Sequence, residues 1–232
     1  YEKVSQIPET AVTRTVYTGM PVRAAVKDLH GTPYPALSEK TDFNILVFGG
    51  SQGASVFSRV VPQAIEKLDG PFRKKLSIVQ QCRPEDYSAL RADYDRLGLR
   101  AEIAPFFQDI PHRIAESHLV ICRSGASTVA EVTAIGRPAI LVPYPNAIDD
   151  HQTANAHAMD EVGGGWLIPD EALTAESLAY RLRTLFKMPR SLQNAAEAAK
   201  RAGRAEAGLA LAELILRLVS GNDERPRVGE VA

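Results

Sequence analysis

The sequence predicts an α/β fold in which helices cover both faces of a Rossmann-like parallel sheet. From residue 43 onwards, short runs rich in β-branched and aromatic residues alternate with longer segments of helical pattern. Glycine and proline bound these runs, and the runs are apolar over most of their length. The alternation indicates βαβ units, and continuously apolar strands indicate a sheet that is buried on both faces.

Six strands and six helices are expected in this unit. The strands are expected at Phe43–Phe48, Leu76–Gln80, Ala101–Ala104, His118–Cys122, Ala139–Pro143 and Gly165–Ile168. The helices are expected at Ala54–Leu68, Glu85–Leu97, Ile110–Glu116, Ser127–Ile135, Asp150–Val162 and Thr174–Phe186. Pro62 lies inside the first helical pattern, so that helix should be kinked there or begin late.

The composition restricts the classes of function. The 232 residues carry 27 lysines and arginines against 28 aspartates and glutamates, a net charge of −1. This balance gives no global basic field for nucleic acid or for an anionic membrane. The longest apolar run, around Ala139–Val142, has the length of a strand, well below the roughly 18 residues of a membrane span. Cys82 and Cys122 lack metal-type spacing, which favours a reduced, cytoplasmic protein over a disulfide.

Two flanking segments do not fit the α/β unit. Thr13–Thr18 is a further strand-like run, and a connector at Gly31–Lys40 separates it from the first expected strand. Ser191–Val219 has the pattern of one long alanine-rich helix after a break at Met188–Pro189. The tail Ser220–Ala232 is polar and is expected to be disordered.

Ligands of an open parallel sheet bind beyond the carboxyl ends of its strands, and three expected strand ends carry suitable residues. The first is followed by Gly49–Ala54, in which Ser51, Gln52 and Gly53 precede a helix. Glycines allow a close backbone approach, and a helix N-terminus favours an anion such as phosphate. The spacing matches neither the dinucleotide motif nor a P-loop, and an ordinary tight turn explains the segment equally well.

The second strand end is followed by Arg123–Glu131, where a turn of small residues leads into a helix. Ser124 or Ser127 can cap that helix. Glu131 lies about one turn into it, where a carboxylate can pair with the vicinal hydroxyls of a ribose. The alternative is a glutamate that is favoured there only by the helix dipole.

The third strand end is followed by Pro143–Asn155, a proline-stiffened loop that leads into a helix capped by one of two aspartates. His151, Gln152 and Asn155 fall in its first two turns. Gln152 and Asn155 are three apart and share a face, and paired amides suit sugar hydroxyls, which need both donors and acceptors. A solvated helix start is the alternative, and taken alone it is the simpler explanation.

The remaining polar residues point to no further site. The other histidines, His30, His112, His118 and His157, lack partners at the spacing of a metal site or a nucleophile triad. No carboxylate cluster suggests an obligatory metal, and no acid pair has a spacing that demands hydrolysis. No cofactor is therefore expected.

Three such turns on successive strand ends describe a cleft for a nucleotide diphosphate sugar. Five motifs, in the right order and spacing, resemble the MurG family of UDP-N-acetylglucosamine–N-acetylmuramyl-(pentapeptide) pyrophosphoryl-undecaprenol N-acetylglucosamine transferases. They are GMPVR at Gly19–Arg23, GGSQGA at Gly49–Ala54, SGASTVAE at Ser124–Glu131, GRPAILVPYP at Gly136–Pro145 and DDHQTANA at Asp149–Ala156. The resemblance covers about residues 13 to 219. Met20, where the family usually has Asn, and a slightly longer loop at Asn146–Asp150 are departures from it.

The resemblance implies roles for individual residues. Arg23 and Ser51 should approach the diphosphate and stabilise it as it leaves. The backbone around Phe107 should read the edge of the uracil, and Glu131 should hold the ribose hydroxyls. The other residues expected to bind substrate are Gln52, Gly53, Ser124, Gly125, Ala126, Ser127, Thr128, His151, Gln152 and Asn155, of which Gln152 and Asn155 should contact the N-acetylglucosamine hydroxyls.

The family fold is a two-domain GT-B glycosyltransferase that holds its donor in the C-terminal domain. The resemblance makes residues 1–22 a remnant strand of the N-terminal acceptor domain, 23–188 the donor-binding domain, 189–219 a helix that returns to the N-terminal domain, and 220–232 a disordered tail. The sequence starts without Met and lacks the family's glycine-rich N-terminal turn, so we interpret it as a piece of a longer chain. Apolar positions of the last helix should be exposed, displaced or covered by a neighbour, namely Leu209, Leu211, Leu214, Ile215 and Leu218.

The implied reaction is an inverting transfer of N-acetylglucosamine from UDP-N-acetylglucosamine to lipid I, which yields lipid II for peptidoglycan. The general base is expected in the N-terminal domain, so no catalytic residue is assigned here, and the fragment should bind donor without transferring it. The intact enzyme is expected in the cytoplasm, peripheral at the inner face of the membrane, without a nucleic-acid partner. Two alternatives stay open: an enzyme like UDP-N-acetylglucosamine 2-epimerase and a non-catalytic nucleotide-sugar-binding module.

Overall fold

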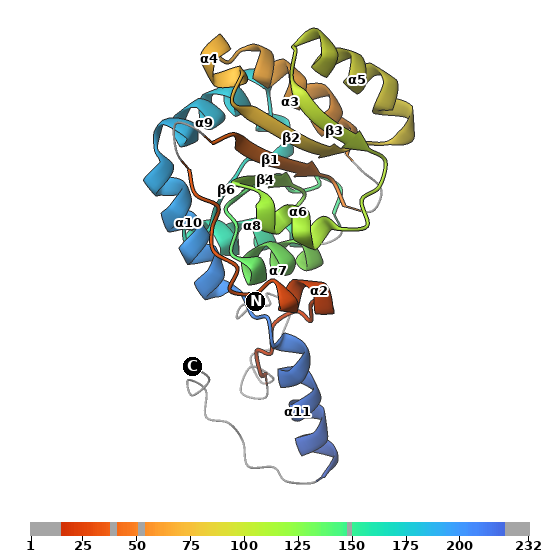
Figure 1. The fold of residues 1–232 in the computed structure, drawn as a ribbon. Coiled ribbons are helices and arrows are strands. Elements are labelled where there is room, and N and C mark those ends of the chain that lie inside the picture. The colour runs from red at the N-terminus through yellow and green to blue at the C-terminus, as the bar shows by residue number, and fades with distance from the viewer. Residues whose placement is uncertain (1–14, 38–40, 51–53, 148–149, 221–232) are drawn as a thin grey trace.

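A six-stranded parallel sheet forms the centre of the computed structural model, which describes residues 15–37, 41–50, 54–147 and 150–220 (Figure 1). The strand order is β3-β2-β1-β4-β5-β6. The strands are β1 (Phe43–Phe48), β2 (Leu76–Gln81), β3 (Arg100–Ala104), β4 (Leu119–Cys122), β5 (Ala139–Leu141) and β6 (Gly165–Leu167). The predicted α/β class and Rossmann-like sheet are confirmed, and the order reverses direction between β1 and β4.

Helices cover both faces of this sheet (Figure 1). They are α2 (Ala24–Asp28), α3 (Ser55–Glu66), α4 (Gly70–Arg73), α5 (Tyr87–Arg96), α6 (Ile110–Glu116), α7 (Ala126–Ile135), α8 (His151–Glu161), α9 (Ala175–Lys187), α10 (Pro189–Ala202) and α11 (Ala207–Val219), with short 3-10 turns η1 (Pro84–Asp86) and η3 (Asp170–Ala172). The sequence did not predict α2 and α4, because four or five residues are too few to show a helical period. Helix α3 begins at Ser55 and continues through Pro62, so it does not begin late.

Alternate residues of β1 enter two separate hydrophobic clusters. Phe43, Ile45 and Val47 pack on one face with α3, α5 and α9. Leu46 and Phe48 pack on the other face with α2, α6, α7, α8 and α10. The period of two along a strand therefore divides one apolar run between both layers, as a doubly covered sheet requires.

The connector before β1 is held to the sheet unit by Arg137, whose residue surface is only 1% exposed. Its guanidinium donates to the carbonyl oxygens of Pro33 at 2.9 Å and Ala115 at 2.6 Å, and to others in the same turn. Burial lowers the pKa of Arg137 to about 10, so the group stays charged at neutral pH. A buried charge is tolerated here because backbone carbonyls replace its water shell.

The C-terminal segment corrects the expected single helix at residues 191–219. Helix α10 ends at Ala202, Gly203 is extended with φ −68° and ψ 144°, and α11 begins at Ala207. A Cβ atom at Gly203 would lie 2.4 Å from the carbonyl oxygen of Thr133 in α7, so only glycine lets the chain pass this close. Helix α10 also packs on α7 and α9 and belongs to the sheet unit instead of leaving it.

Helix α11 extends away from the sheet unit (Figure 1). The expected exposure of its apolar positions is confirmed: Leu209, Leu211, Ile215 and Leu218 are exposed, and Leu214 is partly exposed. The strand-like run at Thr13–Thr18 is described only from Thr15, and residues 15–18 belong to no strand. The expected disordered tail lies, beyond Ser220, outside the described residues.

Replacing Gly203 by alanine should lower the free energy of unfolding by about 1–3 kcal/mol, because the added methyl group collides with the backbone of α7. Chemical denaturation followed by circular dichroism measures this change. Gly70→Ala is the matched control, since nothing lies within 4 Å of a Cβ atom there and its φ is not positive. Equal stability of the two variants would show that α7 and Gly203 are not closely packed in solution.

Candidate functional site

Three helices begin at the carboxyl edge of the sheet, around the point where the strand order reverses. Helix α3 follows β1, α7 follows β4 and α8 follows β5. In none of them does the residue at the N-cap, Ala54, Gly125 or Asp150, cap the helix with its side chain. The positive ends of three helix dipoles thus collect at one edge of the sheet, which suits an anionic ligand.

The start of α7 is exposed to solvent at Ala126 and Ser127. Gly125 occupies the N-cap, so the expected capping by Ser124 or Ser127 is wrong. The Ser124 hydroxyl is buried and donates to the carbonyl oxygen of Gln152 at 2.8 Å. Ala126 and Ser127 are exposed and Thr128 is half-buried, so two hydroxyl side chains lie in the first turn of the helix.

One turn further along α7, Glu131 forms a bidentate ion pair with Arg23. Nε of Arg23 donates to Oε1 of Glu131 at 2.7 Å, and Nη2 donates to Oε2 at 2.7 Å. The Glu131 side chain is 11% exposed and that of Arg23 is 55% exposed. Hydrogen bonding to Glu131 raises the pKa of Arg23 above its ordinary value. The pair joins two residues 108 positions apart that the sequence assigned to different parts of the nucleotide.

The loop after β5 and the start of α8 are braced by the amide pair. Asn155 is 4% exposed, and its Nδ2 donates to the carbonyl oxygen of Ser124 at 2.8 Å. Oε1 of Gln152 accepts from the backbone N–H of Tyr144 at 3.0 Å. Their shared face is confirmed, but it meets the loops after β4 and β5. Asn155 is therefore buried and holds the loop after β4 through its Nδ2 atom, and its expected contact with sugar hydroxyls stays a prediction.

Arg123 is a brace that the sequence argument did not single out. Its side chain, 12% exposed, pairs with Asp170 and donates to the carbonyl oxygen of Pro143 at 2.8 Å. The guanidinium also lies 5.4 Å from the ring centroid of Phe57 and 5.5 Å from that of Tyr144. One arginine thus ties together the ends of β4, β5 and β6. The sequence around Arg123 does not distinguish an arginine that holds loops from one that binds a ligand.

The loop after β3 places Phe107 against Arg113, whose guanidinium carbon is 4.1 Å from the ring centroid. Arg113 also pairs with Glu102 at 2.8 Å and with Asp109 at 2.7 Å. The Phe107 residue is buried, whereas its neighbour Phe106 is exposed. Ser51, Gln52 and Gly53 lie outside the described residues. Gly50, before them, has φ +83°, which makes glycine the favoured residue at this turn.

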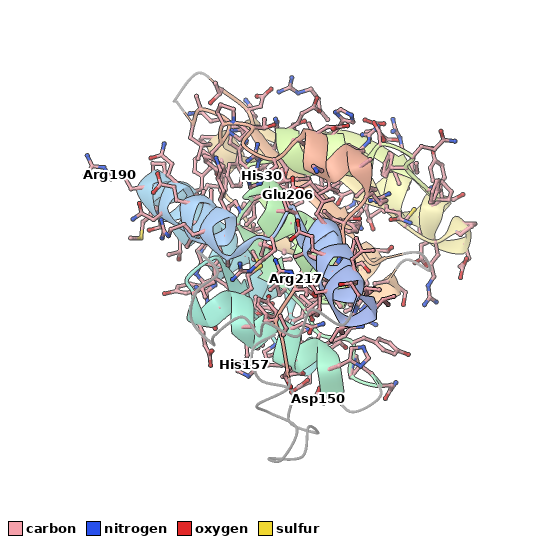
Figure 2. All side chains as sticks on the ribbon, turned by 90° about the horizontal axis from the view of Figure 1, so that it is seen from below. His30, Asp150, His157, Arg190, Glu206 and Arg217 are labelled. Carbon is pink, nitrogen blue, oxygen red and sulfur yellow. The ribbon has the colours of Figure 1, made fainter. Side chains whose placement is uncertain are left out.

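The histidines do not converge. In Figure 2, His30 and His157 lie well apart, the first after α2 and the second on α8. His118 is buried at the amino end of β4, where its Nδ1 accepts from the backbone N–H of Asn44 at 2.9 Å, and burial lowers its pKa. His151 is exposed at the first residue of α8, and Asp150 accepts from the Thr153 hydroxyl at 2.6 Å.

Two features of the described residues bear on the kind of site. Across these parts of the chain, no three or more histidine, cysteine, aspartate or glutamate side chains gather where they could hold a metal ion. Within the same residues, no helix has the length and apolarity needed to cross a membrane. A cavity of about 590 Å³ lies beside α7; Met20 and Ala126 line it, whereas Arg23 and Glu131 do not.

Comparisons with known proteins agree with this geometry. The model of the glycosyltransferase family 28 C-terminal domain matches residues 44–210. The chain is also similar to two proteins named UDP-N-acetylglucosamine--N-acetylmuramyl-(pentapeptide) pyrophosphoryl-undecaprenol N-acetylglucosamine transferase. The one from Rhodospirillum rubrum is 54% identical over 87% of this chain and 52% of its own length. The one from Paramagnetospirillum magneticum is 48% identical over 94% of this chain and 59% of its own length. The chain thus spans somewhat more than half the length of these relatives.

Solved structures give the same answer. The crystal structure of MurG from Acinetobacter baumannii is 32% identical with a TM-score of 0.71, over 79% of this chain and 54% of that one. A UDP-GlcNAc 2-epimerase from Neisseria meningitidis, 12% identical with a TM-score of 0.51 over 77% of this chain and 45% of that one, shares the fold alone. The resemblance to the MurG family and the expected fold, the C-terminal domain of a GT-B glycosyltransferase, are confirmed. The chain therefore belongs to glycosyltransferase family 28, as a C-terminal domain of that family.

Proposed function

We propose that this chain is the donor-binding part of an inverting glycosyltransferase that moves N-acetylglucosamine from UDP-N-acetylglucosamine to a lipid-linked muramyl-pentapeptide. The proposal rests on the position of Glu131. Its carboxylate is mostly buried, is held by an ion pair, and lies about one turn after the N-terminus of α7. A carboxylate at this depth suits the two ribose hydroxyls, and the helix end above it suits a diphosphate. The names of relatives at about 50% identity support the choice of this sugar and this acceptor.

The diphosphate belongs at the N-termini of α3 and α7. Ser127 and Thr128 add hydroxyl donors in the first turn of α7. Ser127 and Glu131 are four residues apart on one face, which separates them by about one turn, 5.4 Å. That arrangement lets one nucleotide reach both with its ribose and its phosphates. The fixed dipoles would stabilise the negative charge that grows on the departing diphosphate.

The remaining contacts follow from the neighbouring strand ends. The backbone around Phe107 would read the uracil, and Ser51, Gln52 and Gly53 would approach the diphosphate. His151 and Gln152 at the start of α8 would face the sugar. Ser124, Gly125 and Asn155 would act by holding the loop after β4 in place, as their hydrogen bonds indicate.

The acceptor site belongs to the part of the full-length relatives that this chain does not span. In the complete enzyme the acceptor's 4-hydroxyl attacks the anomeric carbon, loses its proton to a base of that other part, and UDP leaves with inversion. Residues 23–202 would then form the donor domain, and α11 with residues 15–22 would adjoin the acceptor part. The intact enzyme would work at the inner face of the bacterial membrane without crossing it. This chain alone binds donor and transfers nothing.

The epimerase alternative is less well supported. It needs several acid and base side chains gathered around the sugar. His151 lies at the start of α8, but His30 follows α2, His118 is buried at the amino end of β4, and His157 lines the cavity beside α7. The similarity to UDP-GlcNAc 2-epimerase structures is a similarity of fold, at 12% and 17% identity. A non-catalytic sugar-nucleotide module would share this geometry and differ only in lacking an acceptor partner.

Calorimetric titration of the chain should detect binding of UDP and tighter binding of UDP-N-acetylglucosamine than of UDP-glucose. The preference follows from additional polar contacts between the N-acetyl group and the loop that opens α8. Absence of binding by all three ligands would overturn the donor-domain proposal. Equal affinity for the two sugar nucleotides would contradict the assignment of N-acetylglucosamine.

Replacing Glu131 by alanine should weaken UDP binding by about 1–3 kcal/mol, through the loss of hydrogen bonds to a charged group. Glu176→Ala is the matched control, because that glutamate is on α9 with its side chain 72% exposed and pairs with Lys67. Isothermal titration of both variants gives the comparison. If the Glu131 variant binds UDP with unchanged affinity, Glu131 does not belong to the binding site.

A further inference from the structure

We propose that Arg123 is a positioning residue for the sugar of the donor: it holds the loop after β5 so that Gln152 meets the sugar as a hydrogen-bond donor. The inference rests on the proposed function and adds to it a residue that has no role there. The contacts run from Arg123 to carbonyl groups of the loop, and from the N–H group of Tyr144 in that loop to Gln152.

The loop after β5 carries buried carbonyl groups past the end of the sheet. The N–H group of Val142 still donates to the carbonyl oxygen of Cys122 in β4, at 2.9 Å. The carbonyl groups of Val142 and Pro143 turn to a side chain instead, and both residues are buried. Buried carbonyl groups need a donor. Nη1 of Arg123 supplies it, at 3.2 Å from the oxygen of Val142 and 2.8 Å from that of Pro143.

Asp170 fixes the guanidinium of Arg123 in this place. Its carboxylate pairs with the same Nη1 atom, and the side chains of Asp170 and Arg123 are 24% and 12% exposed. Asp170 is the first residue of η3, a turn closed by the N–H group of Ala172, which donates to the carbonyl oxygen of Pro169 at 3.0 Å. The segment after β6 therefore holds Arg123, and Arg123 in turn holds the loop after β5.

The held loop decides which end of the Gln152 amide is left for a ligand. Tyr144 lies between Pro143 and Pro145, and the two prolines restrict the backbone around it. Its N–H group donates to Oε1 of Gln152 at 3.0 Å. The oxygen end of the amide is thus committed to the loop, and the two N–H groups of Nε2 remain. Within the described residues, no protein group accepts from Nε2.

A Gln152 side chain held in this way recognises an oxygen atom of the sugar that can accept a hydrogen bond. Without Arg123 the loop can shift and the N–H group of Tyr144 no longer fixes the amide, whose terminal torsion is soft. Ordering the amide then takes up part of the binding free energy. The uridine and the diphosphate are bound at other strand ends. Arg123 should therefore act on the part of the affinity that the sugar contributes.

Titration of two ligands into the 232-residue chain tests the inference. They are UDP-N-acetylglucosamine and the β-methyl ester of UDP, which has the same charge and no sugar. The readout is the sugar ratio, the dissociation constant of the methyl ester divided by that of UDP-N-acetylglucosamine. Arg123→Met should lower the sugar ratio by roughly three- to tenfold, the worth of a hydrogen bond between neutral groups, and leave the methyl ester's affinity unchanged. Arg123→Lys should restore only part of it, because the ammonium group ends one bond short of Nη1.

Arg91→Met is the matched control. Arg91 also pairs with a carboxylate, that of Asp95, and donates to a backbone carbonyl oxygen, that of Ala101, but it lies on α5 away from the loop after β5. Its sugar ratio should equal that of the unmodified chain. Circular dichroism of each variant, together with its affinity for the methyl ester, reports whether the fold is intact.

Two further variants keep the test decisive if Arg123→Met does not fold. Asp170→Ala retains the arginine but removes its anchor, and it should lower the sugar ratio in the same direction. Gln152→Glu keeps an oxygen for the N–H group of Tyr144 and removes the donors, so its sugar ratio should fall as well. Because both ligands carry the same charge, repulsion by the new carboxylate affects them alike. In the Gln152→Glu background, Arg123→Met should cause no further fall, since the two residues act as one unit.

The outcomes separate the inference from the proposed function. If Arg123→Met weakens both ligands equally and leaves uridine binding unchanged, Arg123 contacts the diphosphate directly, and the inference is overturned while the proposed function stands. An unchanged sugar ratio in the folded variants of Arg123 and Asp170 overturns the positioning role. A sugar ratio that Gln152→Glu retains overturns the donor orientation. If the unmodified chain binds neither ligand, the proposed function fails as well.

Discussion

The close packing around helix α7 is the constraint on which the rest of this structure depends. The helix follows β4, next to β1, at the point where the strand order reverses. Gly203 lets the chain after α10 pass against its backbone, and Gly136, with φ +78° and Lys200 beside it, ends it. Val26 anchors α2 on the same helix. The direction of α7, and with it the position of its open N-terminus and of Glu131, is fixed by these contacts.

Several polar side chains in this fold hold loops in place through hydrogen bonds to the backbone. Arg123 joins three strand ends, Arg137 secures the connector before β1, and Asn155 holds the loop after β4. Each of them satisfies backbone carbonyls that a loop would otherwise bury unpaired. A site for a negatively charged diphosphate can then be made of helix N-termini, whose dipoles are already oriented before the ligand arrives.

The segments that the sequence predicts well are those in which the local residue pattern agrees with the place of the segment in the folded structure. All six strands appear close to their expected bounds, because an apolar run of four to six residues between glycine and proline has few other uses in a fold of this size. The break between α10 and α11 was missed, since the alanine-rich pattern continues past Gly203 and a lone glycine is compatible with a helix. Helix α2 was missed because it is one turn long.

The sequence by itself determined the layer architecture, the three strand ends proposed as the site, and the motifs that place the chain in its family. Residue type and spacing, which are local properties, named Glu131, Gln152 and Asn155, and the resemblance to the family added Arg23. Only the tertiary structure decided what those side chains contact: Asn155 turns inward to a backbone carbonyl, and Arg23 meets Glu131 across 108 positions of chain. Such partners depend on how α2, α7 and α8 pack against one another, and no period along the sequence records that packing.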